Sequence, residues 1–64
     1  MRHKIVMLTQ EILDAGKSRR GGWNRKQLEL LAVKWPPKTG WKARIIGRLY
    51  IGKILEMFLK ARGS

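Results

Sequence analysis

The sequence contains no cysteine and only one histidine, His3. Without cysteine the fold has neither a disulfide nor a thiolate metal ligand. One histidine cannot hold a metal ion alone, and this one lies beside a chain end that we expect to be frayed. We therefore expect no metal site and no cofactor.

Acidic residues are also scarce, with four in 64 residues. Glu11 and Asp14 have helical i,i+3 spacing, but no histidine or cysteine is near them, so a solvated helix face explains them better than acid–base catalysis. Thr9, Ser18 and Thr39 have no base in a recognisable arrangement. So short a chain also offers little room for a catalytic cleft. We expect no enzymatic activity.

Long hydrophobic runs are missing as well. No fully apolar run is longer than the four of residues 5–8, whereas a membrane-spanning helix needs about 20 residues. The beginning of the sequence lacks the apolar region and cleavage site of a signal peptide. We expect a soluble intracellular protein, cytoplasmic or nucleoid-associated, and a basic amphipathic membrane binder is the least favoured interpretation.

Positive charge, by contrast, is abundant. Fifteen Lys and Arg against four Asp and Glu give a net charge of +11, above the ~2 to 8 that suffices for the solubility of a small domain. Such a charge attracts nucleic acid, an anionic membrane or an acidic protein surface. Residues 17–48 hold ten basic side chains and one acid, Glu29, so this central segment is the predicted binding region.

We expect a single domain, 1–64, with residues 1–3 and 63–64 disordered. Its first predicted element lies in residues 4–15. The apolar residues Ile5, Leu8, Ile12 and Ala15 recur at helical spacing. Thr9 is a competing N-cap, so the helix either covers the whole segment or begins only after residues 5–8, which would then be extended. Gly16 is the expected stop.

A second helix is predicted between residues 24 and 33. Asn24 and Gln27 have the spacing of a capping box, and Trp23 and Leu28 have the spacing of a hydrophobic staple. The predicted buried stripe of this helix is Leu28, Leu31 and Ala32.

Residues 34–40 end that helix, because Pro36 forces Trp35 out of the helical region. Trp35 either plugs the gap between the flanking helices or stands exposed as a stacking platform. We favour the plug, because a core this small gains from every large ring. The predicted aromatic core is Trp23, Trp35 and Trp41.

From residue 41 to 62 the apolar spacing is again helical, with Thr39 as the predicted N-cap. Either one helix runs through, or a break near Gly47 gives helices 40–47 and 49–62, and we favour the break because glycine is costly inside a helix. A second apolar stripe on the last helix predicts a self-association or partner surface, formed by Ile51, Leu55 and Leu59.

These elements predict an all-α fold, a small bundle of three to four helices. Residues 23–48 resemble a helix-turn-helix module, with Gln27, Leu28, Leu31 and Val33 in the supporting helix and its turn and residues 41–48 as the reading helix. The GGW, WPP and GW elements resemble those of small phage or prophage proteins, without indicating one family.

The function predicted from these features is nucleic-acid binding, to DNA or RNA, in which the central cations contact phosphates and helix 40–48 reads a groove. The alternative is a regulator or inhibitor that docks on the acidic surface of a larger assembly, with homodimerisation through the C-terminal helix as an option. The candidate contact residues are Lys17, Arg19, Arg20, Arg25, Lys26, Lys38, Lys42, Arg44 and Arg48.

Overall fold

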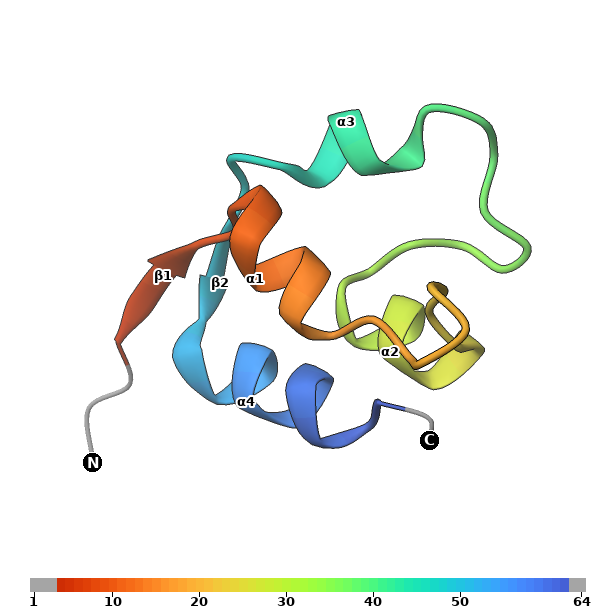
Figure 1. Cartoon of the computed structure of the whole chain (residues 1–64). Helices are drawn as coiled ribbons and strands as arrows, with labels where there is room; N and C mark the ends of the chain where they lie inside the picture. The colour runs from red at the N-terminus through yellow and green to blue at the C-terminus, as the bar shows by residue number, and fades with distance from the viewer. Residues whose placement is uncertain (1–3, 63–64) are drawn as a thin grey trace.

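The computed structural model describes residues 4–62, so the expected disorder of residues 1–3 and 63–64 lies outside the described residues. Within this range the chain forms four short helices and a two-stranded antiparallel sheet, and the all-α prediction is therefore wrong. In chain order the elements are β1 (Ile5–Met7), α1 (Gln10–Ala15), α2 (Arg25–Leu30), α3 (Trp41–Ile45), β2 (Leu49–Ile51) and α4 (Gly52–Lys60) (Figure 1).

The sheet joins the first strand to a segment more than forty positions later in the chain, and the two arrows lie side by side in Figure 1. Val6 pairs with Tyr50 at its centre, and both side chains pack against the core. The pairing continues past the strands, because the Leu8 amide donates to the Arg48 carbonyl at 2.8 Å. Residues that have helical spacing in the sequence are thus held extended by a distant partner.

Helix α1 follows the second of the two predicted alternatives, because it begins only after residues 5–8. Thr9 is extended, and its hydroxyl accepts a hydrogen bond from the Ile12 amide at 3.2 Å. This cap starts the helix at Gln10 and leaves residues 5–7 free to pair as β1. Gly16 is the C-cap, as predicted.

Helix α2 has the predicted capping box. The Asn24 side chain accepts from the Gln27 amide at 2.8 Å, and the Gln27 side chain accepts from the Asn24 amide at 3.1 Å. Gln27 is fully buried, and its amide nitrogen donates to the carbonyls of Gly16 at 2.7 Å and Phe58 at 3.1 Å. One side chain therefore connects the ends of α1 and α4 to the start of α2.

The core lies where α1, α2 and α4 meet the inner face of the sheet. Phe58 of α4 occupies its centre, and Gly16 is packed so closely against the Phe58 ring that a Cβ at this position would clash with it. Ala32, a predicted core residue, is instead exposed and has a left-handed φ of 63°. The buried cluster consists of Leu8, Leu13, Leu31, Ile45, Leu55 and Phe58.

Residues 41–62 do not form one continuous helix, which confirms the predicted break near Gly47. Gly47 lies in a turn and has a φ of 94°. The last helix begins at Gly52 rather than at residue 49, because residues 49–51 pair with β1. Thr39 does not cap α3; the N-cap position is Gly40, with a φ of 84° and no side-chain cap bond.

Ten residues, 31–40, connect α2 to α3, and Figure 1 shows this connector looping away from α1 and α4. A helix-turn-helix has a turn of about three or four residues. The helix-turn-helix prediction is not retained, because the connector is too long for that turn and α3 is only five residues long.

Candidate nucleic-acid interface

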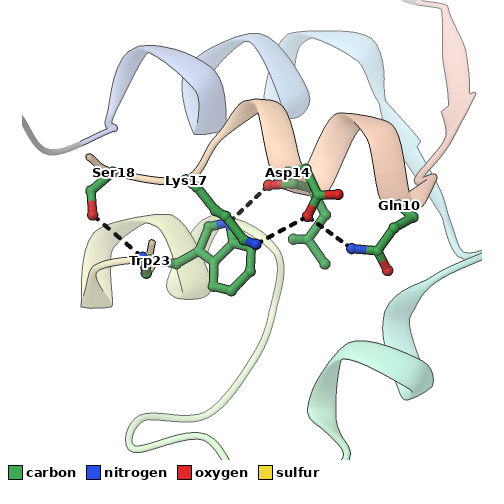
Figure 2. Close-up of polar contacts among 7 residues, drawn as sticks. Gln10, Asp14, Lys17, Ser18 and Trp23 are labelled. Carbon is green, nitrogen blue, oxygen red and sulfur yellow. Dashed lines mark hydrogen bonds and ion pairs between the residues drawn. The ribbon is translucent and has the colours of Figure 1, made fainter. Parts of the chain in front are cut away.

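Two tryptophans form the centre of the basic region. The Trp23 indole nitrogen donates to the Leu13 carbonyl at 2.8 Å, which fixes the ring against the end of α1 (Figure 2). Trp41 meets this ring edge-on, with centroids 5.3 Å apart and an interplanar angle of 86°. Both rings pack against the core, as predicted for these two.

Two lysines from different segments contact the Trp23 ring. The Lys42 ammonium of α3 is 4.7 Å from its centroid, and the Lys17 ammonium is 5.3 Å away. Lys17 also pairs with Asp14 at 3.5 Å, as Figure 2 shows. Trp23 thus brings the segment that follows α1 next to α3, so basic residues far apart in the sequence belong to one region.

The segment that follows α1 contains a tight turn over residues 18–22, called the Ser18 turn below, with two arginines at its tip. The Ser18 amide donates to the Gly22 carbonyl at 2.8 Å, and the Gly21 amide donates to the Ser18 carbonyl at 2.9 Å. Gly21 has a φ of 84°, which glycine adopts without steric cost. This closed turn leaves Arg19 and Arg20 exposed.

The start of α2 contributes two further cations. Arg25 pairs with Glu29 on the same helix at 3.3 Å, and both side chains are exposed. Lys26 is exposed and has no ion pair among residues 4–62. Of the ten basic residues between 17 and 48, eight have no ion-pair partner within the described chain, because only Lys17 and Arg25 are paired.

The remaining cations surround a pocket of about 300 Å³ between the connector and α3. Four basic side chains line it, two from the connector and two from α3 and the turn after it, and its lining contains no carboxylate. Val33, Trp41 and Ile45 give it an apolar wall. The basic lining residues are Lys34, Lys38, Arg44 and Arg48.

Sequence reasoning identified three of these four cations but missed Lys34 and the pocket itself. Lys34 and Lys38 flank the two prolines, and Arg44 and Arg48 have i,i+4 spacing, so each pair is visible in the sequence. Nothing in the sequence indicates that the connector folds back beside α3 to bring the pairs together.

Trp35 is not a plug. The residue is 44% exposed, and it does not belong to the buried cluster or to the residues packed against that cluster. The prediction that it fills the core is therefore wrong. Trp23 and Trp41 already pack against the core, whereas Trp35 lies on the connector and does not pack against it.

The predicted C-terminal stripe is not one surface. Leu55 is buried in the core, Ile51 belongs to β2, and Leu59 is an exposed residue of α4. The stripe assumed a single helix, and pairing of residues 49–51 with β1 removes Ile51 from it.

Comparison with protein families, curated proteins and solved structures gives no match for this chain. Within residues 4–62, none of the helices is long and apolar enough to cross a membrane. The functional argument therefore depends on the geometry and charge of the basic region alone.

Proposed function

We propose that the protein binds nucleic acid through the basic region formed by the Ser18 turn, α2, the connector and α3. The observation that carries the proposal is the pocket, where four cations gather with no carboxylate in the lining. Clustering like charges is unfavourable unless an anion neutralises them. A phosphate backbone supplies such anions at regular intervals, and Lys and Arg are its usual contacts.

The distribution of the cations favours a long polyanion over a single small anion. Arg19 and Arg20 lie on the Ser18 turn, Lys26 lies on α2, and the pocket adds four more. The ammonium groups of Lys17 and Lys42 lie against the Trp23 ring, so these two residues contribute to the positive electrostatic potential and to the shape of the basic surface. A ligand with one phosphate would leave most of these charges without a partner.

The test compares two double variants that remove the same charge. Lys34→Gln with Lys38→Gln neutralises the connector side of the pocket, and Lys4→Gln with Lys53→Gln neutralises two exposed lysines outside residues 17–48. Affinity for a labelled oligonucleotide is measured by fluorescence anisotropy at ~0.1 M salt. Counterion release makes each phosphate contact worth about fivefold to eightfold at this salt concentration, so the pocket variant should bind about 25- to 60-fold more weakly.

The control variant should lose less than about threefold, because long-range attraction between exposed charges is largely screened at this ionic strength. Equal losses in the two variants would show that only net charge matters, and the pocket would have no role. Absence of binding by the unaltered protein to DNA and RNA alike would refute the function.

The second candidate function is docking on an acidic protein, and the outer face of the sheet favours it. Ile5, Met7, Leu49 and Ile51 are 43–64% exposed, and the register places them together as the pairs Ile5–Ile51 and Met7–Leu49. Exposed contiguous apolar side chains are typical of interaction sites. A second copy is a poor occupant, since it would bring two +11 chains together over strands of three residues.

The occupant that fits is therefore an apolar protein patch surrounded by carboxylates, which would complement Lys4, Arg48 and Lys53 beside the sheet. A photo-crosslinking residue at position 49 should give a protein adduct that Ile5→Gln weakens, while the same residue at position 29 of α2 should not. Adducts formed only with a second copy of this chain, or equally from both positions, would contradict this candidate.

A further inference from the structure

Trp35 differs from the other two tryptophans in its surroundings. Trp23 and Trp41 contact each other and the core, whereas Trp35, on the connector, is 44% exposed. The two prolines that follow fix their own φ angles, which restricts the backbone that carries the ring. An exposed indole on a restricted segment loses little conformational freedom on meeting a ligand.

This ring is adjacent in the chain to the pocket. Its neighbours Lys34 and Pro36 both line the pocket, and Lys38 lies three residues further on. An aromatic platform beside a group of cations is the combination by which proteins bind single strands: bases stack on the ring while the backbone follows the charges. The cations alone would suit any nucleic acid, and the exposed ring adds the selectivity.

The pocket has the size and character for a nucleotide backbone unit. About 300 Å³ is at the lower end of the range for small-molecule sites. Its cations suit a phosphate, and its wall of Val33, Trp41 and Ile45 suits a sugar. In a duplex both faces of each internal base are covered by neighbouring bases, so an indole reaches a base face only where the strand is unpaired.

We propose that the ligand is single-stranded nucleic acid, with one unpaired base stacked on Trp35 and the adjoining phosphate held in the pocket by Lys34, Lys38, Arg44 and Arg48. The inference rests on the proposed function and specifies its substrate class. The sugar is left open, and DNA and RNA strands are separate arms of the test.

The experiment measures affinity for four probes by fluorescence anisotropy: a twelve-residue thymidine strand, its uridine RNA counterpart, a twelve-base-pair duplex and an abasic strand with the same phosphates. The variants are Trp35→Ala and Trp35→Phe. The matched control is Leu49→Ala, which truncates an even more exposed apolar residue on the sheet. Circular dichroism verifies that each variant is folded.

Trp35→Ala should weaken binding to the thymidine or uridine strand about 5- to 150-fold, the range that loss of one stacked base gives. Trp35→Phe keeps an aromatic ring and should therefore retain most of the affinity that Trp35→Ala loses. Affinity for the duplex and the abasic strand should change less than about threefold, and Leu49→Ala should change none of the four affinities.

Equal weakening of all probes by Trp35→Ala, or of none, would overturn the inference while leaving nucleic-acid binding in place. Tighter binding of the duplex than of the single strands would overturn it as well. Failure of the unaltered protein to bind any of the four probes would refute the proposed function itself.

Discussion

Replacing Gln27 by leucine tests the contact that holds the helices together. The side chain is fully buried and makes three hydrogen bonds, two as donor to the carbonyls of Gly16 and Phe58 and one as acceptor from the Asn24 amide. Leucine has a similar volume but no polar atom, so it leaves two buried carbonyls without this partner. A buried group left unsatisfied costs about 1–3 kcal/mol, so the loss of a partner by two carbonyls should lower the unfolding free energy by about 2–6 kcal/mol.

That loss is large for this chain. At ~0.05–0.15 kcal/mol per residue, 64 residues correspond to a stability of about 3–10 kcal/mol. Chemical denaturation followed by circular dichroism measures the change, and thermal melting should show a midpoint at least about 8 °C lower.

The control is Lys26→Ala, on the same helix but exposed, which should stay within about 0.5 kcal/mol of the unaltered protein. A Gln27→Leu variant as stable as this control would refute the account of how α1, α2 and α4 are joined.

Two further predictions concern backbone positions and are measured by the same denaturation assay. Gly16→Ala should lower the unfolding free energy by about 1–3 kcal/mol, because the added Cβ clashes with the Phe58 ring. In a double-mutant cycle, Phe58→Leu should recover at least about 0.5 kcal/mol of that loss. If the losses of the two single variants simply add in the double variant, the close packing of Gly16 on Phe58 is contradicted. Ala32→Gly should raise stability by about 0.5–1 kcal/mol, since relief of a left-handed alanine outweighs the added freedom of the unfolded chain; a loss of stability would show that Ala32 does not adopt this conformation.

Local signals in the sequence were sufficient for the starts of α1 and α2. Thr9, the capping box of Asn24 and Gln27, and the stop at Gly16 depend on hydrogen bonds within a few residues, and each is found in the structure. The break near Gly47 is of the same kind, because a glycine turn is a local property.

Features that depend on distant partners could not be predicted in this way. Residues 5–7 and 49–51 have helical apolar spacing, and only their pairing across more than forty positions makes them strands. That pairing turned an expected all-α bundle into a mixed fold and separated Ile51 from Leu55 and Leu59.

The candidate site likewise combines features that the sequence predicts with features that depend on how the chain folds. Composition located the basic segment, and nine of its ten cations were named as contacts from charge alone. The pocket depends on the connector returning beside α3, which no short-range pattern encodes, and Lys34 was missed for that reason. The sequence is compatible with either a buried or an exposed Trp35. Which of the two occurs depends on how much of the core the other tryptophans already cover.

The salt dependence of binding to a single-stranded oligonucleotide tests the central claim most directly. The pocket holds four cations, and eight of the ten basic residues between 17 and 48 have no ion pair within the described chain. If between four and eight phosphates are contacted, at ~0.7 per contact, log K should fall with log salt concentration at a slope of about −3 to −6. In the variant lacking Lys34 and Lys38 the slope should be shallower by about 1.4. A slope near zero, or one that this variant leaves unchanged, would contradict the claim that these cations bind a phosphate backbone.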